Sequence, residues 1–181
     1  MDRFTIEKHW GDELASRLTM DGTEPALQWR REKVTDRDFL LRLFVSVRGP
    51  EFEELPAMLR SSLLEQQFHM QRSSYLSRYS HDSFGVIEHQ GASIGKLYLA
   101  ETKTGIHIVD LALLPDWRNR GIGTFVMKHL CTLAEQEKAS VTLSVFAANP
   151  VLTLYRRIGF RQVAQNSGYL QMLWSPDEPQ A

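Results

Sequence analysis

The segment Asp110-Leu-Ala-Leu-Leu-Pro-Asp-Trp-Arg-Asn-Arg-Gly-Ile-Gly-Thr124 decides the fold. Its apolar first half predicts a buried strand, and its second half predicts a turn that opens a helix. Glycine has no Cβ, so a ligand can approach the backbone closely at Gly121 and Gly123. The first amides of a helix have no partner within the helix, and together with the helix dipole they favour an anion. The segment therefore predicts a phosphate-binding corner.

Three phosphate-binding patterns can be compared with this corner. A P-loop requires a lysine directly after its second glycine, but Thr124 follows Gly123. A dinucleotide fingerprint requires a third glycine where this chain has Val126, and it belongs near the front of a βαβ unit. The third pattern, Arg/Gln-x-x-Gly-x-Gly/Ala, is satisfied by Arg118, Gly121 and Gly123. Only the third pattern fits all of its positions.

That third pattern resembles the pyrophosphate loop of the GNAT superfamily of acetyl-coenzyme A-dependent N-acetyltransferases. A second segment, Asn149-Pro-Val-Leu-Thr-Leu-Tyr-Arg-Arg-Ile-Gly-Phe160, is similar to the family's Asn-x-x-Ala-x-x-x-Tyr-x-x-x-Gly-Phe region. Asn149 lies one residue closer to the tyrosine than in the longest versions of that region. A Gly-x-Gly corner alone can be a bare tight turn. The second match, in the family's order and about 30 residues downstream, favours the family.

Length and composition indicate one soluble domain. We expect it at residues 25–175, between a polar N-terminal extension at 1–24 and a flexible tail at 176–181. The formal net charge of −1 gives no general attraction to nucleic acid or anionic lipid. We find neither the apolar stretch of a signal peptide nor the ~20 apolar residues of a membrane span. The single cysteine, Cys131, is typical of a reducing compartment. We therefore expect a cytoplasmic protein with no nucleic-acid or membrane partner.

Periodicity and turn residues predict an α/β chain in the order strand, two helices, three antiparallel strands, helix, strand, helix and two strands. The predicted strands are 26–34, 83–89, 92–100, 105–114, 141–147, 160–164 and 169–174, and the predicted helices are 11–18, 36–47, 56–73, 120–138 and 150–158. We expect Val47 to be buried in the first long helix, and Leu59 to lie on the apolar face of the second. The GNAT fold has this order: a mixed, mostly antiparallel sheet with helices on both faces.

The resemblance adds a splayed strand pair that holds the cofactor. In the family, the strand before the loop separates from the next one, here 141–147, and the pantetheine pairs with the exposed backbone as a missing strand would. Asn149 corresponds to a residue that hydrogen-bonds the pantetheine, although Asn-Pro is also a good helix start. The cofactor-binding residues implied are Leu111, Ala112, Leu113, Arg118, Asn119, Arg120, Gly121, Ile122, Gly123, Thr124, Asn149 and Tyr155.

Acetyl transfer to an amine needs a neutral nucleophile, a donor for the developing oxyanion and a proton for the departing thiolate. Tyr155 is the candidate acid, because a phenol is protonated at neutral pH and the family has a tyrosine here; the alternative is a core aromatic. Candidate bases lie on the strand before the loop, at His107 and Asp110. They point to opposite faces of a regular strand, unless a bulge intervenes. Water alone is a further alternative.

The resulting hypothesis is an acetyl-coenzyme A-dependent N-acetyltransferase that needs no metal. It transfers the acetyl group directly, in a ternary complex, to the primary amine of a small molecule, with a protein acceptor left open. Dimers are frequent among such enzymes, so a homodimer also stays open. One alternative is a noncatalytic acyl-coenzyme A-binding or sensing module on the same fold. The other is an interaction domain in which the glycines merely form a corner.

Overall fold

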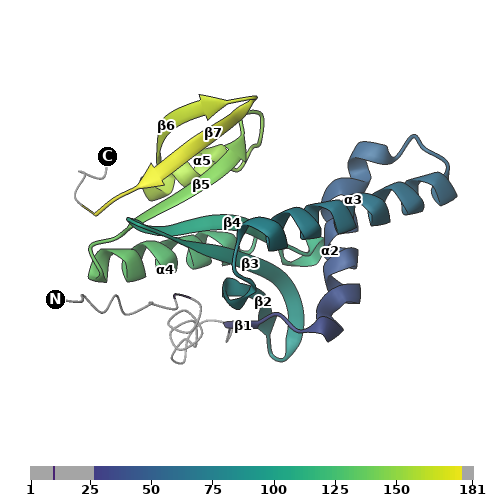
Figure 1. Ribbon diagram of the computed structural model, residues 1–181, viewed down its shortest axis with the longest axis horizontal. Helices are drawn as coiled ribbons and strands as arrows, with labels where there is room; N and C mark the ends of the chain where they lie inside the picture. The colour runs from purple at the N-terminus through teal and green to yellow at the C-terminus, as the bar shows by residue number, and fades with distance from the viewer. Residues whose placement is uncertain (1–9, 11–26, 177–181) are drawn as a thin grey trace.

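The computed structural model describes Trp10 and residues 27–176, whose helices and strands are arranged around one sheet (Figure 1). A seven-stranded sheet has the strand order β1-β2-β3-β4-β5-β7-β6. The strands are β1 (Leu27–Arg31), β2 (Phe84–His89), β3 (Ala92–Thr102), β4 (Gly105–Leu113), β5 (Ser140–Phe146), β6 (Arg161–Asn166) and β7 (Tyr169–Trp174). The helices are α2 (Arg37–Arg48), α3 (Ala57–Arg78), α4 (Ile122–Gln136) and α5 (Leu152–Ile158), with 3-10 turns η1 (Val34–Asp36), η2 (Gly49–Phe52), η3 (His81–Ser83) and η4 (Pro115–Trp117).

Helices cover both faces of this sheet. In Figure 1, α2 and α3 lie at the right, the β5–β7–β6 part with α5 lies at the upper left, and β3 and β4 run between them. Strands β4 and β5 pair in parallel, whereas the other neighbouring strands pair antiparallel. The predicted fold class and the predicted order of elements between residues 27 and 174 are therefore confirmed.

Two apolar clusters, one on each face, hold the layers together. The larger one joins the sheet to α4 and α5, and it includes the predicted inner face of α4: Ile122, Val126, Leu130, Leu133 and Ala134. The smaller one joins α2 and α3 to the sheet through Phe39, Leu40, Leu43, Phe44, Leu64, Phe68 and Val86. Burial of these faces fixes each helix, because propensity alone leaves a helix of this length marginal in water.

Two predicted details of the first helices are wrong. Val47 is 43% exposed, because it lies in the last turn of α2, beyond the contact with α3. Leu59 is 55% exposed, because the first turn of α3 projects past the sheet, and α3 buries only Leu64 and Phe68. Helix α3 also runs five residues past the predicted end at 73, so Tyr75 lies inside it.

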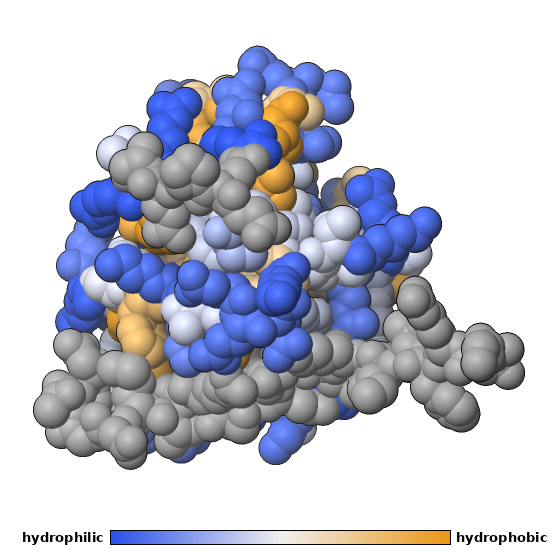
Figure 2. All heavy atoms as spheres, turned by 90° about the vertical axis from the view of Figure 1, so that its left-hand side faces the viewer, coloured by the Kyte–Doolittle hydropathy of each residue, from blue (hydrophilic) through white to orange (hydrophobic). Residues whose placement is uncertain are grey.

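The predicted helix at 11–18 lies outside the described residues, as do the tail residues 177–181 and all but one residue of the extension at 1–24. Trp10 is described, and it packs in the larger core cluster. On the face turned toward the viewer in Figure 2, hydrophilic side chains predominate among the described residues, and the hydrophobic ones stand in small groups. Of the helices in the described part of the chain, none has the length and apolar character to span a membrane.

Strands β4 and β5 separate after four residue pairs. Their pairing runs from Gly105 with Ser140 to Ile108 with Leu143 and then stops, although β4 continues to Leu113 and β5 to Phe146. Beyond this point β5 remains paired with β7, and β4 remains paired with β3. The facing edges of β4 and β5 are thus open, and the predicted splayed pair is confirmed.

A β-bulge at Val109 sets which way the end of β4 faces. Leu99 of β3 pairs with Ile108, but the preceding Tyr98 pairs with Asp110, so Val109 is the extra residue. One extra residue reverses the alternation of the side chains that follow it. His107 and Asp110 therefore point to the same face of the sheet, the one that α3 covers.

Candidate active site

A cavity of about 300 Å³ opens where β4 and β5 separate. Its walls come from both open strand edges, from the last turn of α2, from α3, from the start of β7 and from α5. Five predicted site residues line it, namely Asp110, Leu111, Ala112, Asn149 and Tyr155. The structure therefore brings together residues from three separate parts of the sequence. His107 and Leu113 do not belong to the lining.

The two glycines of the predicted corner lie at the start of α4. Gly121 is the N-cap residue, with φ of 81°, a left-handed conformation that glycine adopts at least cost. No side-chain hydrogen bond caps this end of α4. Ile122, Gly123 and Thr124 occupy the first turn, where backbone amides have no intrahelical acceptor. The corner thus offers amide donors together with the positive end of the helix dipole.

Open space lies above both glycines of the corner. A Cβ built at Gly121 or at Gly123 would have no heavy atom of the described chain within 4 Å. Gly121 is required by its backbone conformation, but Gly123 has no positive φ that would require glycine. Among the described residues, neither backbone conformation nor packing requires glycine at position 123. The open space above the corner has room for an anion such as a phosphate group at the start of the helix.

The basic residues before the glycines make contacts within the chain. Arg118 donates from Nε to the Leu113 carbonyl at 2.9 Å and from a terminal nitrogen to Ser46 at 3.4 Å, so it ties the loop to β4 and α2. The Arg120 guanidinium lies 5.2 Å from the centre of the Trp117 ring. Asn119 has φ of 57°, which turns the chain toward the helix. These contacts fix the shape of the loop.

Tyr155 and Asn149 lie on the wall contributed by α5 and the turn before it. The Asn149 side chain accepts a hydrogen bond from the Val151 amide at 3.0 Å, which organises the start of this turn. Burial, together with the negative charge of Asp110, raises the pKa of Tyr155 to about 12. The hydroxyl therefore stays protonated across the physiological range.

Asp110 forms a buried ion pair that the sequence interpretation missed. Lys96 Nζ lies 2.7 Å from Asp110 Oδ2, and the Tyr75 hydroxyl donates to the same oxygen at 3.2 Å. Both interactions use Oδ2, and no hydrogen bond to Oδ1 is recorded among the described residues. The Lys96 ammonium also lies 5.0 Å from the centre of the Tyr98 ring. Lys96 is, like Asp110, a charged residue within an apolar strand, and this position could have identified it from the sequence as a partner of Asp110.

His107 lies on the same face as Asp110 but beyond the closed end of the splay. Its Nδ1 lies 3.0 Å from the Thr142 hydroxyl, and its ring stacks on Tyr79 at a centroid distance of 6.3 Å. The Thr142 hydroxyl itself donates to the Ile106 carbonyl. Burial lowers the pKa of His107, so the imidazole is neutral at pH 7. These contacts connect His107 to β5 and to the end of α3, where β4 and β5 are still paired.

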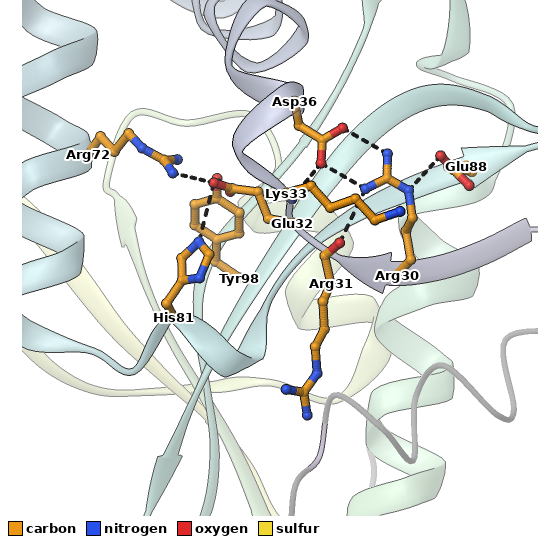
Figure 3. Close-up of polar contacts among 9 residues, drawn as sticks. All are labelled: Arg30, Arg31, Glu32, Lys33, Asp36, Arg72, His81, Glu88 and Tyr98. Carbon is orange, nitrogen blue, oxygen red and sulfur yellow. Dashed lines mark hydrogen bonds and ion pairs between the residues drawn. The ribbon is translucent and has the colours of Figure 1, made fainter.

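A polar cluster behind the cavity fixes Tyr98, the residue beneath Lys96. Figure 3 shows Glu32, at the end of β1, between Arg72 of α3, His81 of η3 and Tyr98 of β3. Arg72 lies 2.5 Å from Glu32 Oε1, His81 lies 3.4 Å from the same oxygen, and Tyr98 donates to Oε2. The fully buried Glu32 carboxylate thereby gains partners from three elements.

A neighbouring ion-pair network anchors the start of α2. The Arg30 guanidinium spans Asp36 and Glu88, at 2.7 Å from each carboxylate (Figure 3). The hydrogen bonds from Arg30 lower the pKa of Asp36, and the carboxylate also accepts from the Lys33 amide. The β1–α2 connection is thus held rigidly, which positions the α2 wall of the cavity.

Comparisons with known proteins agree with the resemblance seen in the sequence. Residues 80–162 match the acetyltransferase (GNAT) domain. Over 55 residues the chain is 40% identical to cysteine-rich protein 2-binding protein from Mus musculus and Homo sapiens; the alignment covers 30% of this chain and 7% of those proteins. The resemblance predicted from the Arg118–Gly123 loop and the Asn149–Phe160 segment is therefore confirmed over the matched residues, which include both segments.

Solved structures share the fold. The PaiA N-acetyltransferase of Thermoplasma acidophilum, in complex with coenzyme A, is 15% identical with a TM-score of 0.63, covering 83% of this chain and 99% of its own. The ribosomal-protein-S18-alanine N-acetyltransferase of Escherichia coli is 16% identical with a TM-score of 0.56, covering 84% and 96%. These matches show the fold that acetyltransferases use. Among residues that the structure describes, no cluster of three His, Cys, Asp or Glu side chains could hold a metal ion.

Proposed function

We propose that this domain is an N-acetyltransferase that moves an acetyl group from acetyl-coenzyme A directly to a primary amine. One observation carries the proposal: a single cavity joins the open edge of β4, the buried Tyr155 hydroxyl and the Asp110 carboxylate. The matched GNAT domain, and the neighbour described as a complex with coenzyme A, support acyl-coenzyme A as the donor.

The chain offers two sets of backbone groups to the donor. The amides from Arg120 to Thr124 face the open space above Gly121 and Gly123, where a diphosphate would accept their hydrogen bonds. The unpaired β4 edge around Leu111 and Ala112 suits an amide-rich chain, which would hydrogen-bond to it as another strand does. The proposed donor-binding surface also includes the residues that shape or border the glycine loop and the α5 turn, namely Leu113, Arg118, Asn119, Arg120 and Asn149.

Asp110 and Tyr155 are the proposed proton-transfer groups. Acetyl-coenzyme A supplies an activated thioester. The acceptor amine has an ordinary pKa near 10, so it must lose a proton before it attacks. Asp110 Oδ1 is the proposed acceptor of that proton, since the bonds from Lys96 and Tyr75 end on Oδ2. Tyr155 is the proposed donor, because its raised pKa holds the proton on its hydroxyl.

Direct transfer is proposed over a covalent enzyme intermediate. Burial raises the pKa of the Cys131 thiol to about 12, so the thiolate that a nucleophile requires is scarce at neutral pH. Cys131 also lies on the inner face of α4, outside the cavity lining. The remaining requirement is that donor and amine be held together, which the shared cavity can provide.

Two measurements test the proposal. The first follows acetylation of a panel of amines through the free thiol of the released coenzyme A, and the second measures coenzyme A binding by calorimetry. In Tyr155→Phe, kcat should fall about 10²- to 10⁴-fold, the usual contribution of a positioned acid, while coenzyme A affinity stays within twofold. Tyr79→Phe is the matched control, since Tyr79 lies outside the cavity lining, and its kcat should stay unchanged.

Two outcomes would contradict the proposal. Intact coenzyme A binding without turnover of any amine would indicate a noncatalytic acyl-coenzyme A-binding or sensing module. Absence of any coenzyme A binding at millimolar concentration would indicate that the glycines only form a corner. Unchanged kcat in Tyr155→Phe would remove the assignment of the acid alone.

A further inference from the structure

We infer that the acceptor is an aromatic monoamine, held by a platform formed by Phe146 and Tyr169. This inference rests on the proposed N-acetyltransferase activity and names the class of its substrate. It follows from the walls of the cavity that are not part of the proposed binding surface for acetyl-coenzyme A. The open edge of β4, Asn149 and Tyr155 belong to that donor surface. The other walls are the last turn of α2, the middle of α3 and the ends of β5 and β7.

Phe146 and Tyr169 form an exposed aromatic pair at the cavity. They are cross-strand partners at the end of the β5–β7 ladder, and their rings meet edge to face at 5.6 Å. Each is 51% exposed, although large apolar side chains usually lie in the core. Both line the cavity. Both side chains thus leave surface available to a partner, and aromatic rings bind other rings in edge-to-face or offset geometry.

The opposite wall is also apolar. Leu43, Phe44 and Val47 line the cavity from α2, on successive turns of one helix face. Val47, which the sequence predicted to be buried, is 43% exposed at this wall. A flat apolar group between the two walls would cover Val47 and both rings, and removal of this surface from water favours binding.

The charges of the lining disfavour an acceptor with several positive charges. The charged lining residues are two cations, Arg48 and Lys96, and one anion, Asp110. Lys96 is paired with Asp110, and Arg48 pairs at 3.0 Å with Glu51, which lies outside the lining. These pairs leave Asp110 Oδ1 as the carboxylate oxygen that can receive one ammonium group. A polyamine would bring its further charges close to Arg48 and Lys96, and this like-charge approach disfavours it.

The test compares 2-phenylethylamine, butylamine and spermidine as acceptors for the full chain with saturating acetyl-coenzyme A. The kcat/KM for 2-phenylethylamine should exceed that of both other amines by at least about tenfold, from ring contact with the platform. Phe146→Ala and Tyr169→Ala should each raise KM for 2-phenylethylamine about 2- to 10-fold, with kcat and the KM for acetyl-coenzyme A unchanged.

Two further variants separate ring contact from general effects. Phe146→Leu keeps apolar area but removes the ring, so it should raise KM for 2-phenylethylamine and leave that for butylamine unchanged. Val163→Ala alters an exposed apolar side chain of β6 outside the cavity, and its kinetics should match the wild type. Preference for spermidine, or an unchanged KM in both alanine variants, would overturn the inference and leave the N-acetyltransferase intact. Absence of turnover with all three amines, and with the wider panel above, would instead overturn the proposed function.

Discussion

Replacement of Gly123 by alanine should stabilise the free protein and weaken its binding of coenzyme A. Gly123 lies in the first turn of α4 without a positive φ, and an added Cβ meets no heavy atom within 4 Å. Alanine at a compatible helical position gains about 0.4–1 kcal/mol over glycine, mainly because it restricts the unfolded chain. For a chain of this length that gain raises the melting temperature by about 1–4 °C.

The same methyl group would stand in the space proposed for the diphosphate. Loss of one charge-assisted hydrogen bond from a backbone amide costs about 1.5–3 kcal/mol, which is a factor of about 10–150 in Kd. A ligand at 100 times its Kd stabilises by about 2.7 kcal/mol, and this falls to about 1.4 kcal/mol when Kd rises tenfold. The expected signature is therefore an increase in the melting temperature of the free protein together with a smaller shift on addition of coenzyme A.

Thermal unfolding with and without coenzyme A, and calorimetry for Kd, measure both effects. Gly49→Ala is the matched control: Gly49 has φ of −53°, and its added Cβ would meet only Val45 Cγ1 at 3.8 Å, an ordinary contact. Its Kd should be unchanged, and its gain in stability should be smaller, because Pro50 disfavours a helical residue with a Cβ before it. The reasoning is refuted if Gly123→Ala binds coenzyme A as tightly as the wild type, or if it destabilises the free protein.

Three further predictions concern titration and the buried ion pair. The pKa of Tyr155 is raised from 10 to about 12, so the unfolded chain loses this proton first as the pH rises. The contribution of Tyr155 to stability is therefore complete below pH 10 and is lost as the pH rises toward 12. Tyr155→Phe should show a smaller decrease in the free energy of unfolding over that range. The pKa of His107 is lowered, so the unfolded chain takes up this proton first as the pH falls. The free energy of unfolding should therefore decrease as the pH drops below about 6.5. In denaturant titrations at several pH values, His107→Gln should show a smaller decrease. Lys96→Met leaves the partly exposed Asp110 carboxylate without its cation and should destabilise by about 1–3 kcal/mol. Adding Asp110→Asn should recover part of that loss in denaturant titrations, and no recovery would contradict the pairing.

The predictions that succeeded rest on signals confined to one segment. The inner face of α4 follows from apolar spacing, and the start of this helix at Gly121 follows from the turn residues before it. The glycine loop and the Asn149–Phe160 segment together were specific enough to predict the family. Each of these signals lies within one continuous segment of the sequence.

The features that were missed depend on contacts between distant segments. The length of α3 was underestimated because Ser73 and Ser74 are weak helix formers, and packing of Tyr75 against Phe84 and Tyr98 outweighs that preference. The exposure of Val47 also follows from tertiary structure, since its spacing matches the buried residues of α2. Helical spacing gives the apolar face of a helix but not how far along its length a partner extends.

The bulge at Val109 shows most clearly what the sequence could not supply. The run from Ile106 to Leu114 contains no glycine or proline that would mark an extra residue, so regular alternation places His107 and Asp110 on opposite faces. Only the pairing with β3 reveals that Tyr98 lies opposite Asp110. This register directs the carboxylate toward α3 and beside Lys96.

Burial of the Lys96–Asp110 pair is a costly way to stabilise a sheet. Desolvation costs several kcal/mol per ion, and apolar residues of similar size are often equally stable in such positions. Val86 and Phe84, the cross-strand partners of Lys96 and Tyr98 on β2, are fully buried and show that this face of the sheet readily takes apolar residues. A pair retained only for stability would have no reason to border the cavity, whereas both charges line it and Asp110 Oδ1 receives no hydrogen bond from described residues. The charges are therefore better explained by the chemistry of the cavity than by the stability of the sheet.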